Sequence, residues 1–348
     1  MKIAYVITGK FENEGGIEKK VYNQIKEWTK NGNKVKLFCF TKYNVNSLFK
    51  SLDVEIISFR NYLDLAINPL LIKKILKWKP DIVYFRQQRF TFPFYIMFKK
   101  FPTVIEYNTD DVEEMKLYAS LAKRVYNRLT REIMNHLAAG FVTVTYELEG
   151  KLRKYNKPIV TIANGIGNDL PQVNRKGKDN GINVIFIGTP NCLWHGVDKI
   201  YYLASNLLDV DFHLIGIEDG PELNNVYTYG YLNIDRYIEI VEFCDVAIGT
   251  LALHRNSMNE ASPLKVREYL HFGLPVIIGY EDTDFIDREE EFILKISNEE
   301  DNVKRNLQLI YDFIKQSKSK TVDRKKISHI YYSEKEKKRL DFFLQLCR

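Results

Sequence analysis

Two glutamates, Glu260 and Glu268, enclose the seven residues Ala261-Ser262-Pro263-Leu264-Lys265-Val266-Arg267, and this stretch could bind a phosphorylated polyol. Carboxylates accept hydrogen bonds from vicinal hydroxyls, so one glutamate could hold a sugar and the other a ribose. Between them, the N–H groups of Leu264 and Lys265 open a predicted helix, and helix starts attract anions. With the Lys265 ammonium, they predict a phosphate site between the two carboxylates.

The flanking residues define this helix. Ser262 is a good N-cap residue and Pro263 a good first helical residue, while Gly273 and Pro275 end the helix and precede a strand. The first glutamate is therefore expected in the loop before the helix, and the second in its second turn. A polar helix start with solvated glutamates is the alternative, because the same spacing of glutamates recurs elsewhere in the chain.

A second candidate is the loop after the first predicted strand. Gly15 and Gly16 precede a helix that starts near Glu18. Glycines let the backbone approach a ligand closely, and the helix start again offers unpaired N–H groups. The spacing is not that of the G-x-G-x-x-G dinucleotide fingerprint, and a plain tight turn is the alternative.

Strand-like runs alternate with helical patterns along the chain, which predicts an α/β fold of two Rossmann-like, doubly wound parallel sheets. The predicted strands are residues 2–8, 34–40, 54–59, 81–85, 103–107, 140–145, 159–163, 183–188, 212–216, 245–249, 275–279 and 292–296. Predicted helices include 18–30, 70–77, 112–137 and 334–346, the last with Leu340, Phe343 and Leu344 on an apolar face. In such sheets, ligands bind at the carboxyl ends of the strands.

The breaker-rich segment 171–181 is expected to link two domains. The first comprises residues 1–168 with the closing helix 332–348, and the second residues 169–331. Residues 1–170 hold 28 Lys and Arg against 17 Asp and Glu, a net charge of +11, whereas the whole chain carries +6, so the remainder is −5. A basic half is typical of proteins that meet an anionic partner, such as a membrane leaflet or a polyanionic acceptor.

Composition narrows the function classes. The 348 residues are 45% hydrophobic and 28% charged, an ordinary globular composition with no apolar run long enough to span a membrane. The four scattered cysteines and the absence of a signal-like start predict a cytoplasmic protein with reduced thiols. No zinc motif or P-loop is present, and the D-x-D matches at residues 209–211 and 282–284 are too short to predict a metal site. The basic, aromatic segment 86–100 fits nucleic-acid stacking, a membrane-facing surface or a core helix with a basic end.

Several short motifs, in this order and spacing, resemble those of retaining glycosyltransferases of family 4, which have the GT-B fold. They are the Glu260–Glu268 stretch, Gly15-Gly16-Ile17-Glu18, Ala163-Asn164-Gly165-Ile166, Phe186-Ile187-Gly188, His195-Gly196-Val197-Asp198, Leu214-Ile215-Gly216 and Tyr229-Gly230-Tyr231. The resemblance covers almost the whole chain, and the closing helix resembles one that returns to the first domain. It implies two facing domains, of which the first binds the acceptor and the second the nucleotide sugar.

The sequence departs from that family at the cations that hold the diphosphate. The family usually has an Arg where this chain has Thr189, and a Lys where it has His195. Many members also carry a first-domain His, for which Arg86 is the expected substitute. Glu106 and Asn108 resemble a variant that pairs such an Arg with Glu-x-Asn. Arg255, five residues before Glu260, is a further candidate cation.

The resemblance implies a metal-independent transferase that moves a sugar from a nucleotide-diphosphate sugar to a glycan, lipid-linked or protein acceptor, in surface polysaccharide or glycan synthesis. No cofactor or nucleic acid is expected, and an anionic inner membrane face is a candidate partner. The expected catalytic residues are Glu260, Lys265 and Arg86, with Glu106 and Asn108 on the acceptor side. Donor binding is expected from Gly15, Gly16, Gly188, His195, Tyr229, Tyr231, Ser262, Pro263, Leu264 and Glu268. The alternatives are a non-catalytic nucleotide-sugar-binding subunit and an epimerase or phosphorylase.

Overall fold

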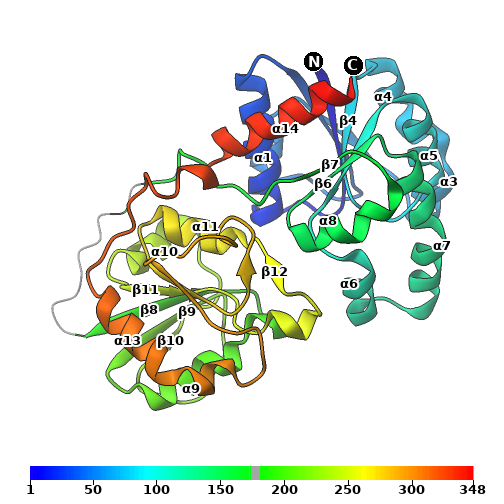
Figure 1. Ribbon diagram of the computed structural model, residues 1–348. Coiled ribbons are helices and arrows are strands. Elements are labelled where there is room, and N and C mark those ends of the chain that lie inside the picture. Colours follow the sequence, from blue (N-terminus) through cyan, green and yellow to red (C-terminus); the bar gives the residue numbers. More distant parts are fainter. Residues whose placement is uncertain (172, 174–180, 348) are drawn as a thin grey trace. The chain divides into compact units, whose positions relative to one another are not determined.

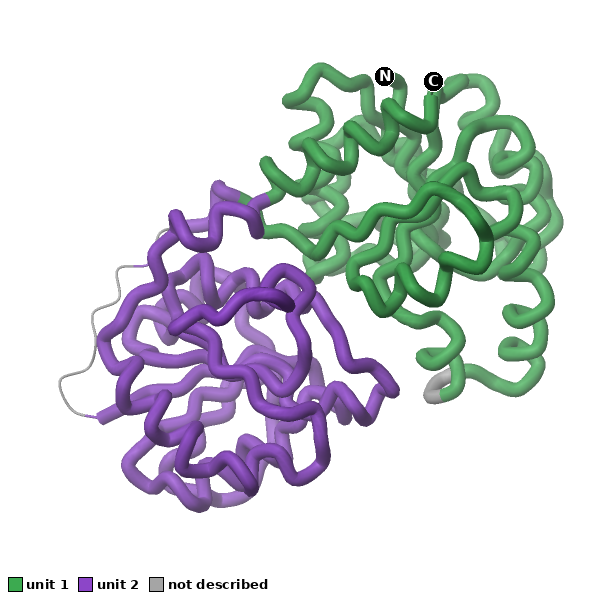
Figure 2. The backbone as a smooth tube through the Cα atoms, in the orientation of Figure 1, with its two compact units in different colours: residues 1–167, 332–348 green, residues 168–331 purple. Residues whose placement is uncertain are grey.

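The computed structural model describes residues 1–171, 173 and 181–347, with the backbone alone at 117 and 118. Two compact units divide the chain, Met1–Gly167 with Tyr332–Arg348 as unit 1 and Asn168–Tyr331 as unit 2 (Figure 2). Most of the predicted linker, 171–181, lies outside the described residues.

Unit 1 is built on seven parallel strands in the order β3-β2-β1-β4-β5-β6-β7 (Figure 1). The strands are β1 (Lys2–Thr8), β2 (Lys34–Phe40), β3 (Val54–Ile57), β4 (Ile82–Arg86), β5 (Thr103–Tyr107), β6 (Gly140–Thr143) and β7 (Ile159–Thr161). The helices are α1 (Gly16–Lys30), α2 (Ser47–Lys50), α3 (Tyr62–Ile67), α4 (Lys73–Trp78), α5 (Phe92–Lys100), α6 (Asp111–Tyr118), α7 (Leu121–Leu137), α8 (Tyr146–Leu152) and α14 (Tyr332–Leu346), with 3₁₀ turns η1 (Pro69–Ile72) and η2 (Arg153–Tyr155). The strand order reverses between β1 and β4, which makes the carboxyl ends of these strands the expected ligand position.

Both faces of this sheet are buried, as continuous apolar strands require. Alternate residues of β1 enter different cores, Ala4 and Val6 on one face and Ile3 and Tyr5 on the other. Helix α5 covers the first core, whereas α1 and α14 cover the second, so the C-terminal helix is part of unit 1 (Figure 1).

Helix α14 differs from its predicted face. Leu340, Phe342 and Phe343 are buried, but Leu344 is exposed. Charged residues are buried in its place: Trp28 donates its indole N–H to Glu336 at 2.7 Å, and Glu336 also pairs with Arg339. The expectation for Leu344 is therefore wrong, because these buried polar contacts rotate the helix away from a purely apolar seam.

The single helix predicted over residues 112–137 is two helices, α6 and α7. The chain leaves α6 at Ala119, and Ser120 takes extended φ/ψ angles at the N-cap position of α7. A serine favours such a cap over a helix interior. The break lets α7 run in its own direction.

Unit 2 holds six parallel strands in the order β10-β9-β8-β11-β13-β15, and the order reverses between β8 and β11. The strands are β8 (Ile182–Ile187), β9 (Val210–Ile215), β10 (Val226–Thr228), β11 (Val246–Ile248), β13 (Val276–Ile278) and β15 (Ile293–Lys295), besides the short pair β12 (Glu260–Ala261) and β14 (Glu281–Asp282). The helices are α9 (Val197–Asn206), α10 (Ile234–Val241), α11 (Leu264–His271), α12 (Asn302–Arg305) and α13 (Leu307–Ser317), with 3₁₀ turns η3 (Leu193–His195), η4 (Leu253–Asn256) and η5 (Ser328–Ile330).

The predicted fold class of two doubly wound parallel sheets is confirmed. A membrane-crossing helix would need more length and apolarity than any helix among the described residues has.

Candidate functional site

The strongest candidate for an anion site in unit 2 is Lys265, in the first turn of α11. Its Nζ atom is buried and has no hydrogen-bond partner among the described residues, and it lies 4.3 Å from the centre of the Phe186 ring on β8. Burial lowers the pKa of Lys265 to about 7, although the nearby Cys192 thiol acts in the opposite direction. An unpaired buried cation is costly, so an anion brought to this ammonium is strongly favoured.

His195 lies in the same neighbourhood, at the point where the strand order reverses. Its backbone carbonyl accepts the N–H of Leu251, which follows β11, at 3.2 Å. Its ring Nδ1 accepts the backbone N–H of Thr189 at 3.4 Å. Burial, together with the charge of Lys265, lowers the pKa of His195 to about 3, so the imidazole is neutral at pH 7.

Gly188 and Gly216 lie where there is no room for a Cβ atom. A Cβ atom on Gly188 would lie 2.3 Å from the Phe186 ring. Gly216 has φ +80°, and a Cβ on it would lie 2.1 Å from the carbonyl oxygen of Gly188. These glycines allow the loops that follow β8 and β9 to touch.

The segment before α11 differs from the sequence-based expectation. Glu260 lies on β12 and is buried, rather than in an open loop. Pro263 occupies the N-cap position and Leu264 begins the helix, so Ser262 does not cap it. The Ser262 hydroxyl instead accepts a hydrogen bond from Arg267 at 2.9 Å.

Arg267 is the residue that sequence reasoning missed here. It is fully buried and forms ion pairs with Asp282 at 2.7 Å and Asp284 at 2.9 Å. The carboxylates of the second D-x-D match are thus engaged by this arginine. Its guanidinium ties β14 to the segment that carries Glu260 and Lys265, which positions both.

Glu268 and the two tyrosines of the predicted base-binding segment have different surroundings. The Glu268 carboxylate accepts the hydroxyl of Tyr237 on α10 at 3.1 Å. The Tyr229 hydroxyl pairs with His213 at 2.8 Å, so this ring is held against the sheet. Tyr231, by contrast, is 79% exposed.

A pocket of about 480 Å³ opens at the carboxyl ends of β8 and β9. Thr189, Cys192, Asp198, Glu218 and Arg255 are among its lining residues. It therefore borders the segment that carries His195, at the edge of the sheet where ligands bind in this architecture.

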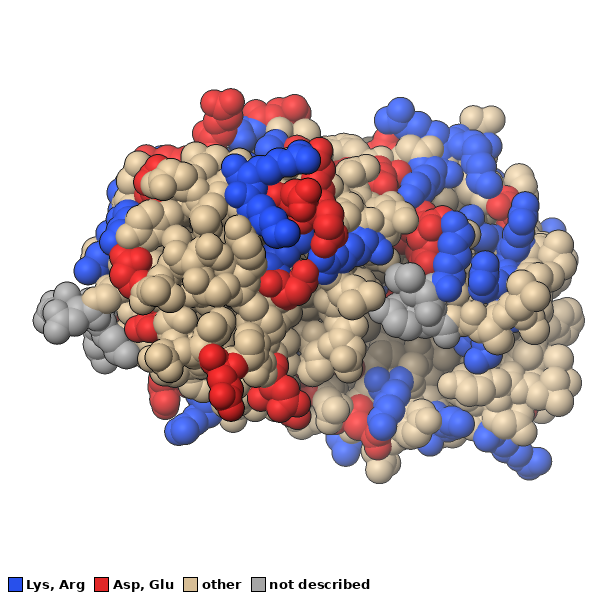
Figure 3. Space-filling view, turned by 90° about the horizontal axis from the view of Figure 1, so that it is seen from below, with Lys and Arg blue, Asp and Glu red and all other residues tan. Residues whose placement is uncertain are grey.

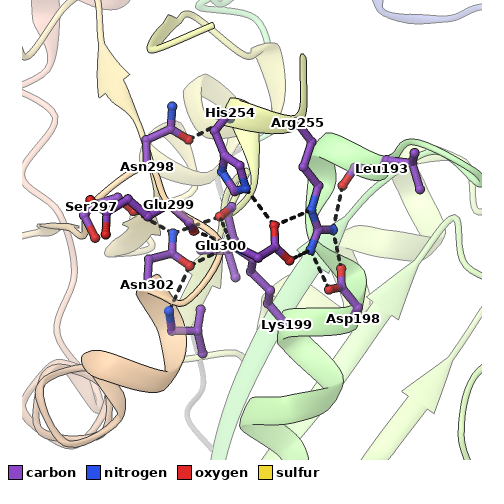
Figure 4. A network of polar contacts seen from close by, with 12 residues as sticks. Leu193, Asp198, Lys199, His254, Arg255, Ser297, Asn298, Glu299, Glu300 and Asn302 are labelled. Atoms are coloured by element: carbon purple, nitrogen blue, oxygen red, sulfur yellow. Dashed lines mark hydrogen bonds and ion pairs between the residues drawn. The ribbon is translucent and has the colours of Figure 1, made fainter. Parts of the chain in front are cut away.

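Arg255 is not available as the free cation that its position suggested. Its guanidinium binds both carboxylate oxygens of Asp198 at 2.8 Å and also pairs with Glu300 (Figure 4). These hydrogen bonds raise the pKa of Arg255 and lower that of Glu300. The network closes one wall of the pocket, and Arg255 is engaged within it.

Unit 1 has a buried charged cluster at the ends of β4 and β5. Lys20 on α1 pairs with Glu106 at 2.8 Å and donates to the Asn108 side-chain oxygen at 2.5 Å. Arg86 lies 3.6 Å from the other Glu106 oxygen. Burial opposes the charge of Glu106, but Lys20 and Arg86 outweigh it and hold its pKa well below the usual range.

The charged cluster contains two side-chain hydrogen-bond donors that a ligand could use. Arg86 Nη1 and Asn108 Nδ2 are buried and find no hydrogen-bond partner in the described part of the chain. Burial also lowers the pKa of Lys20 to about 8, against the opposing pull of Glu106. Arg86, Glu106 and Asn108 were predicted, whereas Lys20 was missed, because its charge on a helix reads as solvated until the fold buries it.

The first-loop glycines are placed less favourably than predicted. Gly15 is the N-cap of α1, and its N–H donates to the Glu18 carboxylate at 3.1 Å. Gly16 is the first residue of the helix. The Gly15 amide is therefore engaged by the capping side chain of its own helix rather than open to an anion.

Unit 1 also has a pocket, of about 430 Å³. It lies at the carboxyl ends of β1 and β4, where the strand order reverses. Gly9, Arg89 and Phe90 line it, together with Tyr62 and Tyr126. Sequence reasoning missed this pocket, because its walls come from α3, α7 and the loop after β4.

Comparisons with known proteins agree with this architecture. Residues 14–169 match the family described as Glycosyltransferase Family 4, which supports that family for unit 1. No curated protein matches the sequence.

Solved structures of the same fold cover nearly the whole chain. The apo form of the lipopolysaccharide outer core galactosyltransferase WaaB matches with TM-score 0.69 and 13% identity over 99% of both chains. HepE from Anabaena, in complex with UDP and glucose, matches with TM-score 0.69 and 14% identity over 99% of both chains. UDP-GlcNAc 2-epimerase from Neisseria meningitidis, bound to UDP-GlcNAc, matches with TM-score 0.56 and 12% identity over 99% of this chain and 100% of its own. At these identities the likeness shows the fold, which is GT-B.

Proposed function

We propose that the protein is a retaining glycosyltransferase, which moves a sugar from a nucleotide-diphosphate sugar to a hydroxyl of a glycan, lipid-linked or protein acceptor. The observation that carries the proposal is the Lys265 ammonium at the start of α11, which is buried and makes no hydrogen bond within the part of the chain that the structure describes. The family match of residues 14–169 and the UDP bound to structural neighbours such as HepE support it.

In this proposal the diphosphate lies against Lys265 and the first turn of α11. Negative charge grows on the diphosphate as the bond to the sugar breaks, and a preorganised cation stabilises that charge. Because the incoming hydroxyl approaches the same face, the departing phosphate accepts its proton, and no protein nucleophile or metal ion is required. Glu260 then holds the sugar hydroxyls, and Glu268 holds the ribose.

Unit 1 supplies the acceptor side. Arg86 Nη1 is ion-paired with Glu106, but neither it nor Asn108 Nδ2 makes a hydrogen bond to a described residue, so both donors suit the oxygens of a glycosyl or phosphate group. Glu106 orients Arg86 and also pairs with Lys20, so the three side chains carry a net positive charge when Lys20 is protonated. We also propose that the protein acts in the cytoplasm in glycan or surface polysaccharide synthesis.

One observation favours a non-catalytic nucleotide-sugar-binding protein as the second candidate. Thr189 and the neutral His195 stand at the two places where resembling transferases carry cations. The epimerase among the structural neighbours provides a third possibility of the same fold.

A donor screen distinguishes these functions. Nucleotide sugars are incubated with the protein, with and without oligosaccharide or polyprenyl-phosphate-sugar acceptors, and free nucleoside diphosphate is measured. Acceptor-dependent release that Lys265→Met abolishes, but the exposed control Lys318→Met retains, supports transfer, and NMR of the product reports whether the anomeric configuration is retained. Release without acceptor points to an epimerase-type activity. Binding without release favours the non-catalytic protein and overturns the proposal.

A further inference from the structure

Helix α7 turns apolar side chains toward solvent. Leu121 and Leu129 are 71% and 69% exposed, and Val125 and Ile133 of the same helix are also exposed. These four residues follow one another at intervals of four, so they lie along one side of the helix. A surface helix normally shows the opposite pattern, with its apolar side toward the core.

The side of α7 that faces the protein carries polar side chains beside the core residue Met134. Asn127 and Arg131 bind the two carboxylate oxygens of Asp111 at 2.7 and 2.8 Å. Further along, Asn135 accepts the hydroxyl of Tyr107 at 2.7 Å. These buried hydrogen bonds fix the rotation of α7 about its axis. The apolar side of the helix therefore has to face the solvent.

The exposed apolar surface continues on the neighbouring elements. Leu63 and Ile67 of α3 and Leu70 of η1 are all strongly exposed. Helix α5 packs against α3, η1 and α7, and these elements follow one another along one side of unit 1 (Figure 1). We call the outward side chains of α3, η1 and α7 the docking face.

Basic side chains accompany this face. Lys123, Arg124 and Arg128 of α7 and Lys99 and Lys100 at the end of α5 are exposed. Among the described residues, none of these five takes part in an ion pair. Lys and Arg side chains crowd the part of the surface that belongs to unit 1 (Figure 3).

We propose that the docking face binds an anionic lipid bilayer, with the α7 leucines inserted among the acyl chains and the bases at the headgroups. This combination of an outward apolar stripe and flanking Lys and Arg is that of helices that lie in a membrane interface. A second copy of the chain satisfies it less well, because a two-fold contact would bring equal sets of unpaired cations together. The inference is independent of the transfer reaction.

Docking would also place the unit 1 pocket at the bilayer. Tyr62 and Tyr126 line that pocket and are themselves exposed beside the face. A hydroxyl acceptor attached to a membrane lipid could then reach the carboxyl ends of β1 and β4 without leaving the bilayer surface.

Vesicle flotation with the full chain tests the proposal. The wild type is expected to float with vesicles of phosphatidylcholine and phosphatidylglycerol at low salt. Leu121→Gln with Leu129→Gln should weaken partitioning by at least about tenfold, because apolar area no longer leaves water. Arg124→Gln with Arg128→Gln should weaken binding to anionic vesicles and leave any binding to pure phosphatidylcholine unchanged. The matched control, Leu208→Gln with Leu309→Gln, changes two exposed leucines of unit 2 and should float like the wild type.

A depth measurement separates insertion from surface adsorption. Trp fluorescence of Leu121→Trp should shift to the blue and be quenched by brominated lipids, whereas that of Leu208→Trp should not. No flotation of the wild type, flotation of the leucine variant equal to wild type, or no quenching at position 121 would each overturn the proposal. A lipid-free dimer that the Leu121→Gln and Leu129→Gln changes dissolve would overturn it in favour of a second copy.

Discussion

Lys265 Nζ lies 4.3 Å from the centre of the Phe186 ring, and no described residue accepts a hydrogen bond from it. The contact joins the first turn of α11 to the end of β8, the central strand of the unit 2 sheet. The ring partly stabilises the cation through its π face but leaves its three N–H donors unused. The arrangement suits a ligand that brings negatively charged oxygens.

We expect Lys265→Met to weaken binding of a nucleoside diphosphate by about 10- to 150-fold, since a charged hydrogen bond contributes about 1.5–3 kcal/mol. Turnover of a transferase should fall by about a hundredfold or more, the scale for removing one such electrostatic donor. Titration calorimetry of Lys265→Met, Lys265→Arg and the control Lys318→Met measures the first effect. Equal affinity in Lys265→Met and wild type would mean that the diphosphate is held elsewhere.

The same lysine makes the stability of the ligand-free protein depend on pH. Its folded pKa of about 7 lies below the unfolded value of about 10.4, so between these pH values the unfolded chain binds more protons and stability rises with pH. We predict that Lys265→Met lowers this slope by up to about 1.4 kcal/mol per pH unit between pH 7 and 10. Urea unfolding at several pH values measures the slope, and an unchanged slope in the variant would contradict the depressed pKa.

We predict different roles for Glu260 and Glu268, the first in recognising the donor sugar and the second in binding the nucleotide. Glu268→Ala is expected to weaken binding of the bare nucleotide, with a loss of about 1.5–3 kcal/mol for a charged hydrogen bond. Glu260→Ala should leave bare nucleotide binding near wild type and reduce discrimination among donor sugars. Because Glu268 also accepts the Tyr237 hydroxyl, Tyr237→Phe controls for loss of that internal contact. Equal effects of both glutamate changes on the bare nucleotide would contradict this division.

We predict that replacing His195 has little effect on nucleotide binding. Its pKa of about 3 means that it carries no charge at the pH of the cell, and its Nδ1 serves as an acceptor for the Thr189 N–H. We expect His195→Gln to retain nucleotide affinity within about threefold, since an amide oxygen can accept the same bond. The dependence of binding on pH from 5 to 8 should not change. Loss of a titration near pH 6.5 in the variant would show that the ligand charges this histidine.

Much of the architecture could be predicted because most strands are continuous apolar runs bounded by turn residues, whereas the short strands β10, β12 and β14 lack such a run and were not predicted. The ends were less accurate, as at 54–59, where β3 stops at Ile57. The break between α6 and α7 was missed because Ser120 is only a weak local signal for a helix start, whereas the contacts of Asn127 and Arg131 with Asp111, which hold α7 in its direction, come from the fold.

The residues of the candidate site could be predicted where they lie close to one another along the chain. Lys265 and Glu268 follow from the residues around one helix start. Arg267 and Lys20 could not be found in this way, because their partners Asp282 and Glu106 are 15 and 86 residues away along the chain. A charged residue reveals its role only when the fold removes it from water.

The Lys20–Glu106 pair tests whether burial by the fold gives these charged residues their role in stability. Both side chains are buried, so Lys20→Met leaves the Glu106 carboxylate with the more distant Arg86 and the hydrogen bonds from Tyr5 and Gln24. We expect a loss of stability of about 3–5 kcal/mol, as for other broken buried ion pairs. Glu106→Gln should cost a similar amount, while the double variant should cost clearly less than the sum, because neither Lys20 nor Glu106 is then left buried without the other. The exposed pair Lys337–Glu334 is the control, and Lys337→Met should change stability by less than about 1 kcal/mol.

The depressed pKa of Glu106 in the folded protein also predicts a dependence on pH. The contribution of the Glu106 carboxylate to the free energy of unfolding is present above about pH 4.3 and is lost as the pH falls below that value. Urea unfolding of the wild type and the four variants at pH 7 and pH 4 measures both effects. Strictly additive losses would show that Lys20 and Glu106 stabilise unit 1 separately rather than as a pair.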